Sequence, residues 1–502
     1  MTVERIYMEE QKVENLFEKI VALSKRRGFV YPGSEIYGGL ANTYDYGPMG
    51  TELLRNIKNA WWSHFIHGRR DMVGIDASII SSHKIWDASG HTASFADALV
   101  DCKNCKFRTR ADHLIEDYLE TIPDEKLSSI GEDIRIGFES LNVDFEKIKN
   151  AIQTRKVEGL STSELTHMIN FFSINCPKCG PKHDWTEVRK FNQLFPVKLG
   201  IVEGDDSLAY LRGETAQGIF INFKNVMDTN RVKIPFGIGQ IGKSFRNEIT
   251  MGNFVFRTIE FEQGEIEFFF DPAVTEWEPL FENWKKEMWN FVTKELGVNA
   301  ENLRWRVHTD EERSFYSKKT EDLDYKYPFG FKELWGIAYR TDYDLKAHME
   351  HSGKDLQVVD SSNGRKFIPH VIEPAVGINR LFLMVLFDAY REEGERVWLS
   401  LHPKIAPFKA AVFPLLGNKP ELTEKAEKLF DDLKKQFNVT WDDRGNIGKR
   451  YAAQDEIGTP FCITVDFQSL EDETVTIRDR DLGTQERLAI SKLAQFITEK
   501  IN

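Results

Sequence analysis

The pattern of hydrophobic and polar positions predicts helices in four segments, amphipathic in residues 11–30 and apolar with a single arginine in residues 377–390. These segments are residues 11–30, 51–66, 278–296 and 377–390. In residues 51–66, for example, Leu53, Ile57 and Trp61 fall on one side of a helix, where they can pack on a core. We therefore predict a helix in each of the four segments.

Strand-like spacing dominates from about residue 232 to residue 271. Arg246 and Glu248 are two residues apart, so on a strand their side chains would share one face. Glu265 and Glu267 have the same spacing and follow a glycine-containing loop. The pattern predicts a hairpin that carries charged side chains along its faces.

The segment 110–175 differs from these strands because it is charged and helix-like. Ser161 and Glu164 have the spacing of a capping box, which marks the start of a helix. The segment lies between two Cys-x-x-Cys pairs, and we interpret it as an insertion into a larger domain.

Beyond about residue 405, strand-like and helix-like segments alternate, which is typical of a small separate α/β domain. We interpret residues 391–396, a charged stretch around one glycine, as the linker that precedes it. The chain is thus predicted to contain a main domain, an insertion and a C-terminal domain. Their boundaries are 1–101 with 180–395, 102–179, and 400–502.

Length and composition agree with a folded protein of several domains. A chain of 502 residues is too long for one ordinary core. Its 41% hydrophobic and 29% charged residues are typical of soluble proteins. We see no secretory signal and no apolar run long enough to cross a membrane. Only five cysteines occur, which fits a reducing compartment and predicts a cytoplasmic protein.

Four of the cysteines form the two pairs that flank the insertion, Cys102 with Cys105 and Cys176 with Cys179. Two thiolates three residues apart can supply two corners of a tetrahedral zinc site. We therefore expect one structural Zn²⁺ held by all four. The alternative is four thiols without a metal, of which one pair could be redox-active.

The charged hairpin needs a chemical explanation because its aromatic residues make it too apolar to lie fully exposed. A buried arginine favours bidentate contact with a carboxylate or a phosphate, and a buried glutamate can accept from an amino group. Uncompensated, such buried charges are costly. The hairpin therefore points to a ligand that carries both anionic and cationic groups, such as a nucleotide with an amine, in a site that is not a P-loop.

Several stretches resemble those of class II aminoacyl-tRNA synthetases, in the same order along the chain. Residues 245–248, Phe-Arg-Asn-Glu, resemble the start of motif 2, and residues 370–382, HVIEPAVGINRLF, resemble motif 3. The stretches LRGETAQGIFINF, GIAYRTDYDL and YDYGPMG resemble the homodimeric type of glycyl-tRNA synthetase, and RYAAQDEIGTPFCITVDF resembles its anticodon-binding domain. The resemblance implies an α+β fold: an antiparallel class II sheet flanked by helices, a zinc-binding helical insertion and a C-terminal α/β anticodon-binding domain.

The resemblance also implies roles toward ATP. Arg246 would grip the α-phosphate, Glu248 would read the adenine amine, Phe261 would stack on adenine, and Arg380 would close over the nucleotide. Arg246 and Arg380 are therefore the implied catalytic residues. The implied ATP contacts are Arg246, Asn247, Glu248, Phe256, Arg257, Thr258, Ile259, Glu260, Phe261, Glu333, Leu334, Gly377, Ile378, Asn379 and Arg380.

For glycine, the resemblance implies that Glu214, Glu265 and Glu373 surround the ammonium group and that Arg340 faces the carboxylate. The implied glycine contacts are Arg110, Glu214, Phe261, Glu262, Gln263, Gly264, Glu265, Arg340, Glu373, Pro374, Ala375, Val376 and Gly377. The expected reaction is ATP-dependent attachment of glycine to tRNA(Gly) through a glycyl-adenylate, assisted by Mg²⁺.

The expected partners are tRNA(Gly), glycine, ATP and a second copy of the chain, with no membrane. The formal net charge is −13, so tRNA must be held by local basic positions, for which we expect Lys449, Arg450, Arg478 and Arg480. The dimer is expected to form through the N-terminal part, because residues 51–66 carry more tryptophan than one face of a monomer needs. Two alternatives stay open: a catalytically weakened tRNA-binding paralogue, and a class II synthetase for another amino acid.

Some positions depart from the pattern of the family. They are Gly213, Met251, Ile259, Gly264 and Ala375. Gly213 and Gly264 are expected to add backbone freedom beside the glycine pocket. Ile259 removes a positive charge near the ATP loop.

Overall fold

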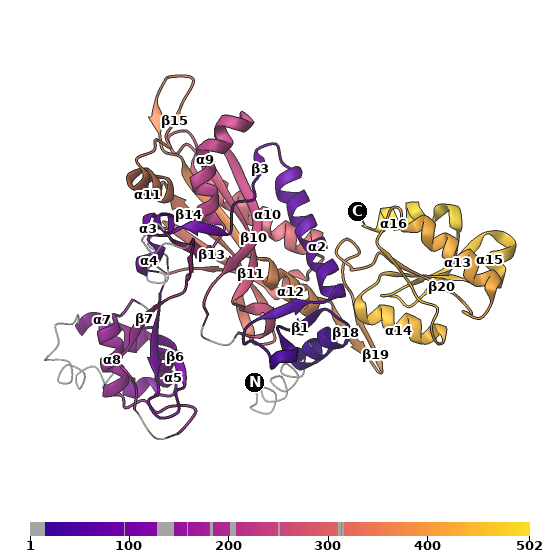
Figure 1. Cartoon of the computed structure of the whole chain (residues 1–502), viewed down its shortest axis with the longest axis horizontal. Helices are drawn as coiled ribbons and strands as arrows, with labels where there is room; N and C mark the ends of the chain where they lie inside the picture. The colour runs from indigo at the N-terminus through magenta and orange to yellow at the C-terminus, as the bar shows by residue number, and fades with distance from the viewer. Residues whose placement is uncertain are drawn as a thin grey trace.

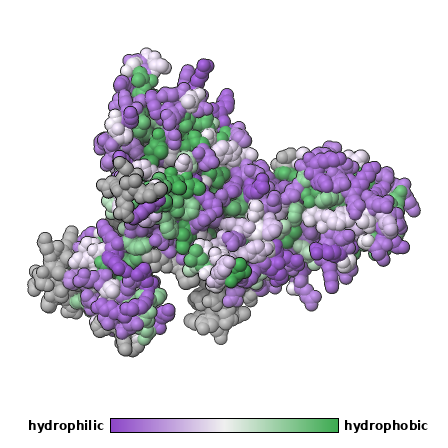
Figure 2. Space-filling view, viewed as in Figure 1, coloured by the Kyte–Doolittle hydropathy of each residue, from purple (hydrophilic) through white to green (hydrophobic). Residues whose placement is uncertain are grey.

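The structure is a computed structural model of the chain, and Figure 1 shows a central body, an insertion on one side and a C-terminal domain on the other. It describes residues 16–94, 96–127, 145–157, 159–180, 184–200, 207–248, 252–309, 313 and 316–501. Hydrophilic residues cover most of the face shown in Figure 2, and hydrophobic residues are visible mainly in the central body. In the described residues, no helix is both long and apolar enough to cross a bilayer.

A seven-stranded sheet forms the centre of the body, in the order β12-β13-β14-β17-β11-β10-β3. The strands are β3 (Met72–Gly74), β10 (Phe236–Phe245), β11 (Glu260–Phe270), β12 (Leu303–Val307), β13 (Lys319–Tyr327), β14 (Gly330–Thr341) and β17 (His370–Gly377). All neighbours are antiparallel except β3 and β10, which run parallel. The predicted antiparallel sheet is confirmed.

One face of the sheet packs on three helices, α2 (Pro48–Trp62), α10 (Trp277–Asn290) and α12 (Ile378–Ala389). Their apolar residues, such as Trp61 and Trp284, share one core with Phe268 of β11. These helices confirm the predictions for residues 51–66, 278–296 and 377–390. Of the predicted helix at 11–30, residues 16–26 are helical, and the part before residue 16 lies outside the described residues.

The other face of the sheet carries the charged side chains of β11 and is covered in part by α9 (Ala216–Asn230) and α11 (Tyr343–Ser352). Alternation along β11 separates the faces, since Ile266 and Phe268 join the helical core while Phe269 packs on α9 through Phe223, with ring centroids 4.4 Å apart. Glu265 and Glu267 share the face of Phe269. The sheet thus places two carboxylates beneath α9.

The chain differs from prediction at two places in the body. β10 ends at Phe245, so Arg246 and Glu248 lie in the loop that follows the strand and not on one strand face. The stretch 391–396 is a hairpin, not a plain linker, because β18 (Tyr390–Glu393) pairs with β19 (Arg396–Leu399). Gly394, with a φ of 60°, supplies the left-handed residue that such a tight turn requires.

Smaller elements surround the central sheet. They are β1 (Val30–Pro32), η1 (Glu35–Tyr37), β2 (Tyr44–Tyr46), η2 (Ser63–His67), β4 (Ile80–Ser82), α3 (His83–Ala88), α4 (His91–Ser94), β8 (Phe195–Lys198), β9 (Leu208–Leu211), η4 (Phe254–Phe256), η5 (Phe291–Glu295), η6 (Ala300–Asn302), β15 (Val358–Val359) and β16 (Lys366–Phe367). The segment from β9 to α9 brings Glu214 over the sheet.

The insertion has its own sheet and core. Its elements are β5 (Ala96–Asp101), β6 (Arg108–Arg110), α5 (Ala111–Glu120), α7 (Phe145–Thr154), α8 (Thr162–Phe171) and β7 (Arg189–Asn192). Ser161 caps α8 and exchanges hydrogen bonds with Glu164, so the predicted capping box is confirmed. The core of this unit includes Cys102 and Cys176.

The C-terminal domain is a five-stranded mixed sheet in the order β21-β20-β22-β23-β24, flanked by helices. Its elements are β20 (Ala410–Pro414), α13 (Pro420–Leu433), β21 (Val439–Trp441), α14 (Ile447–Ile457), β22 (Phe461–Val465), α15 (Phe467–Asp472), β23 (Thr474–Asp479), β24 (Gln485–Ala489), η7 (Ile490–Lys492) and α16 (Leu493–Ile501). β20 runs parallel to both β21 and β22, as the predicted α/β domain requires. Cys462 is buried in this core, as expected.

Candidate active site

A cavity of about 400 Å³ opens on the face of the central sheet that carries the charged side chains. Its walls come from the loop before α9, the loop after β10, and strands β11, β13, β14 and β17 with the start of α12. The lining residues that the sequence predicted are Glu214, Arg246, Glu248, Phe256, Arg257, Thr258, Phe261, Gln263, Glu265, Glu333, Glu373, Ala375, Val376, Gly377, Asn379 and Arg380. Segments more than 130 residues apart in the sequence therefore meet at one site, as expected.

One end of the cavity is formed by three buried carboxylates, those of Glu214, Glu265 and Glu373. Glu265 accepts hydrogen bonds from the backbone N–H of Thr215 at 2.8 Å, from the hydroxyl of the same residue, and from Gln263 Nε2 at 2.9 Å. Glu373 accepts from Arg340. These hydrogen bonds hold the carboxylates of Glu265 and Glu373 in place.

The three carboxylates differ in their readiness to ionise. Burial works against ionisation of Glu214, but His91, whose Nε2 lies 3.2 Å from Oε2 of that glutamate, outweighs it and holds the pKa well below its usual range. Burial raises the pKa of Glu265, and the charge of Glu214 adds to the rise. Burial also raises the pKa of Glu373 to about 8, although Arg340 opposes the shift. A cation placed among the three would favour their ionised forms and be bound in return.

Glu267 lies deeper on the same strand face and is fully buried, and neither oxygen of its carboxylate has a hydrogen-bond partner among the described residues. Burial and the nearby Glu373 raise the pKa of Glu267 well above its usual value. A neutral carboxyl group is the form that such a site tolerates. Glu267 is absent from the cavity lining.

The other end of the cavity combines arginines with aromatic rings. Arg246 donates from Nε to the carbonyl of Gly213 at 3.0 Å, and its guanidinium carbon lies 5.3 Å from the centre of the Phe261 ring. Arg380 lies at the start of α12, 4.5 Å from the Phe256 ring, and its Nη1 is 3.0 Å from Oε1 of Glu333. Two guanidinium groups suit the phosphates of a nucleotide, and flat apolar rings suit its base.

Some predicted contact residues do not line the cavity. They are Arg110, Asn247, Ile259, Glu260, Glu262, Gly264, Leu334, Arg340, Pro374 and Ile378. Arg110, in the insertion, is paired with Asp97 and Asp112. Glu262 accepts from Lys58 Nζ of α2 at 2.9 Å, so its side chain lies on the face of the sheet that packs on α2. Arg340 is buried behind Glu373 and is held by Asp344.

The cavity also has lining residues that the sequence analysis missed. They are Val255, His308, Tyr316, Thr320, Asp322, Gly336, Ile337 and Ala338. Thr320 and Asp322 are two apart on β13, a spacing that places both on one strand face. That alternation is the only sequence signal for them. Asp322 accepts from His308 Nε2 at 2.7 Å, and burial together with the nearby Glu333 raises the pKa of Asp322.

The unusual glycine at position 264 faces away from the carboxylates. A Cβ atom there would lie 3.1 Å from Trp61 Cε2 and 3.2 Å from Ile378 Cδ1, so the missing side chain makes room for the Trp61 ring. The expectation that Gly264 loosens the glycine pocket is therefore wrong. The residue serves close packing of α2 and α12 on the sheet.

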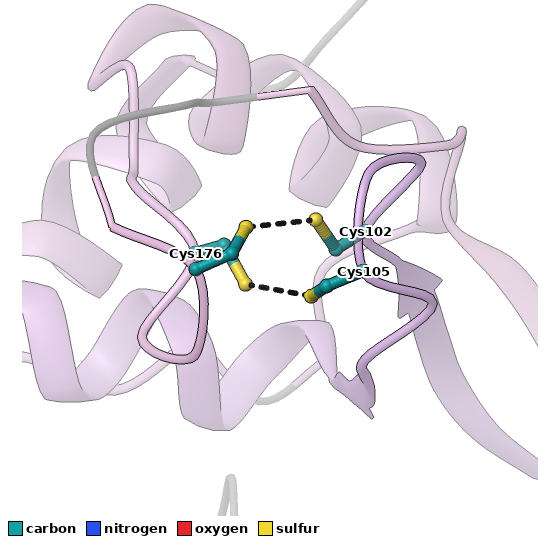
Figure 3. Close-up of side chains that lie close together, drawn as sticks. Cys102, Cys105 and Cys176 are labelled. Carbon is teal, nitrogen blue, oxygen red and sulfur yellow. Dashed lines mark hydrogen bonds between the residues drawn. The ribbon is translucent and has the colours of Figure 1, made fainter.

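The four paired cysteines meet in the insertion (Figure 3). Cys102 and Cys179 approach to 3.7 Å between sulfurs, and Cys105 and Cys176 to 3.6 Å. All four sulfurs lie within 4.8 Å of one another. A tetrahedral zinc with Zn–S bonds of about 2.3 Å separates its sulfurs by about 3.8 Å, so the donors and their spacing fit Zn²⁺.

The basic residues expected to hold tRNA need a correction. Arg450, Arg478 and Arg480 are only 2%, 9% and 1% exposed. Arg478 forms a two-pronged pair with Asp455, and Arg480 donates to backbone carbonyls at 2.6 and 2.9 Å. The N–H groups of Arg478 and Arg480 donate to buried carboxylate and carbonyl oxygens, so these arginines stabilise the C-terminal domain itself. Lys449, on α14, is exposed.

Two family models match parts of the chain. Residues 97–193 match the glycyl-tRNA synthetase insertion domain 1, and residues 409–500 match an anticodon binding domain. The first match contains the cysteine cluster, and the second covers the C-terminal sheet and its helices.

Whole-chain relatives agree with these matches. A glycine–tRNA ligase of Clostridium acetobutylicum is 50% identical over 496 residues, which cover 98% of this chain and 100% of the relative. A glycine–tRNA ligase of Caldanaerobacter subterraneus is 52% identical over 97% of this chain and 99% of the relative. One from Clostridium tetani is 51% identical over the same shares.

Proposed function

Because this chain belongs to the glycine–tRNA ligase family and attaches glycine to tRNA, we propose that its carboxylate-lined cavity forms glycyl-adenylate. The observation that carries the proposal is the convergence of three buried carboxylates with Arg246 and Arg380 in one cavity. Glycine offers an ammonium and a carboxylate, and ATP offers phosphates and a flat base. The two ends of the cavity match these groups.

In the proposed complex, the ammonium lies among Glu214, Glu265 and Glu373. The glycine carboxylate then points toward Arg246 and attacks the α-phosphate in line, forming the acyl–phosphate bond while the bond to pyrophosphate breaks. No protein nucleophile is needed, so catalysis rests on positioning and on stabilising negative charge. Arg246 supplies the positive charge at the phosphate. In the second step a hydroxyl of the 3′-terminal ribose of tRNA attacks the adenylate carbonyl, the acyl–phosphate bond breaks, and AMP leaves.

The nucleotide end supports matching roles for its residues. Phe261 and the Arg380 guanidinium bracket the adenine, and Glu248 accepts from its amino group. The family uses ATP with Mg²⁺, and Asp322 and Glu333 offer the hard oxygen ligands that this ion prefers. When bound there, Mg²⁺ would neutralise phosphate charge and relieve the repulsion between these two carboxylates.

The test is ATP–pyrophosphate exchange with glycine, alanine, serine, proline and threonine in turn. Exchange should be fastest with glycine and at least about 100-fold slower with alanine, because the carboxylates leave no room for a methyl group. Faster exchange with any other amino acid would reject the assignment of the pocket. If the protein bound tRNA but catalysed no exchange with any amino acid, the result would point to a weakened paralogue.

We also propose that Zn²⁺ holds the insertion through Cys102, Cys105, Cys176 and Cys179. The four-sulfur set and the spacing of its sulfurs support this, and the metal would join the two ends of the insertion. Metal analysis should find about one zinc per chain, and Cys179→Ser should lose it and make the insertion sensitive to protease.

Cys462→Ala is the matched control for the zinc prediction, because this thiol is buried in the C-terminal core. It should keep the full zinc content. Metal-free protein with a protease-resistant insertion would exclude the zinc proposal.

We propose a homodimer formed through the N-terminal part of the body. Surplus tryptophan is not a sufficient reason, because Trp61 is fully buried within its own chain and Trp62 is half-buried against the same core. A better reason is the segment after β1, where Ile36 and Tyr37 are 89% and 87% exposed and Leu40 is also exposed. Sedimentation should give twice the mass of 58.1 kDa, and Ile36→Asp with Tyr37→Asp should shift it toward the monomer.

Val274→Asp is the control for the dimer, since Val274 is an apolar residue that is also largely exposed, elsewhere on the surface. It should leave the mass unchanged. A monomer that is fully active would refute the dimer.

We place the enzyme in the cytoplasm, where its free thiols stay reduced.

A further inference from the structure

A chain of buried side chains joins the opposite walls of the carboxylate pocket. The Nε2 of Gln217 donates to Glu214 Oε1 and to Asp344 Oδ1, both at 3.0 Å. Asp344 accepts from Nε and Nη2 of Arg340 at 2.8 and 2.9 Å, and Arg340 Nη1 donates to Glu373. All five residues are buried. We call this hydrogen-bonded series of five side chains the carboxylate bridge.

His348 determines which way the Gln217 amide points. Both hydrogens of the amide nitrogen are used by carboxylates, so its oxygen must accept, and His348 Nε2 lies 2.8 Å from that oxygen. Rotating the amide by half a turn would direct its oxygen at two carboxylates and its N–H groups at a donor. His348 and Asp344 are four residues apart on α11 and share one helix face, so α11 supplies both contacts to the amide.

The bridge matters because it lies between like charges. Without the amide, the carboxylates of Glu214 and Asp344 would face each other across a buried gap with no donor between them. If Asp344 moved, the Arg340 guanidinium would move with it, because the two are joined by hydrogen bonds. Glu373 would then move with Arg340. The width of the pocket therefore depends on a side chain, that of Gln217, which does not itself touch glycine in the proposed complex.

We infer that Gln217, oriented by His348, is a positioning residue that fixes the spacing of Glu214 and Glu373 and thereby the rejection of amino acids larger than glycine. The inference rests on the proposed placement of the ammonium group. It adds two residues to the determinants of specificity, neither of which lines the cavity.

The test is steady-state ATP–pyrophosphate exchange with glycine and with alanine. Gln217→Leu keeps the bulk but removes the amide, and it should raise the KM for glycine about tenfold, as expected when buried acceptors lose a donor. The ratio of alanine to glycine kcat/KM should rise, and the KM for ATP should stay within about twofold. His348→Gln retains an N–H donor and should behave like the wild type, whereas His348→Leu should resemble Gln217→Leu.

Two further variants separate the possible failures. Asn222→Leu, on the same helix, removes an amide bonded only within α9 and should change nothing. Glu214→Gln tests the pocket itself. If Glu214→Gln impairs glycine use and Gln217→Leu does not, the bridge is overturned; if neither does, the proposed pocket fails. Equal loss of glycine and ATP binding in Gln217→Leu, or equal behaviour of the two His348 variants, would mark a merely structural role and also overturn the inference.

Discussion

Replacing Arg246 by alanine is expected to lower glycine-dependent ATP–pyrophosphate exchange by about 10²–10³-fold, the usual loss when one donor to a developing charge is removed. Arg246 is positioned in advance by the carbonyl of Gly213 and by the Phe261 ring, so it requires no rearrangement when charge develops on the phosphate. The loss should lie mainly in kcat. Arg246→Lys should recover only part of the rate, because a lysine keeps the charge but not the planar fork.

The control for Arg246 is Arg55→Ala, which removes an exposed arginine on α2, away from the cavity. It should leave the exchange rate unchanged. If Arg246→Ala kept the rate within about threefold, the cavity end that we assign to the phosphates would have to be reassigned.

Replacing Glu265 by alanine is expected to weaken glycine use by roughly 2–5 kcal/mol, the cost of losing one partner of a buried charge pair. The same change opens space next to the Cα of glycine, so alanine should be rejected less strongly than by the wild type. Exchange with both amino acids measures the two effects together. Glu267→Ala should have a milder effect, because that side chain lies below the cavity lining.

Glu350→Ala, on the exposed side of α11, is the matched control for Glu265 and should behave like the wild type. Unchanged glycine exchange in Glu265→Ala would remove this residue from the site. A fall in glycine exchange with an unchanged alanine-to-glycine ratio would show that Glu265 binds the ammonium without limiting the pocket.

The regular elements were predictable where one periodicity prevails. The helices α2 and α10 each bury one apolar side against the sheet, and that side is visible in the sequence at helical spacing. Helix α12 is buried on nearly all sides, and it is visible as an apolar run. The hairpin at Tyr390–Leu399 was not predictable in this way, because its strands are charged and short. Its turn depends on one left-handed glycine, Gly394, which also fits a loop.

The site was predictable to the extent that family motifs carry it. Arg246, Glu265 and Glu373 lie in such motifs and meet in the cavity. Thr320 and Asp322 do not, because ordinary polar residues on a strand give no sign of what they face. The same limit explains the error at Arg478 and Arg480, since a sequence shows charge but not burial.

In the complex that we propose, the ammonium group of glycine lies among Glu214, Glu265 and Glu373 while Arg246 contacts the phosphate. The most direct measurement is a crystal structure of the protein with a non-hydrolysable glycyl-adenylate analogue. We predict the amino nitrogen within about 3.2 Å of carboxylate oxygens from at least two of the three glutamates, with the adenine between Phe261 and Arg380. An amino group bound elsewhere, with the three carboxylates facing only protein, would contradict it.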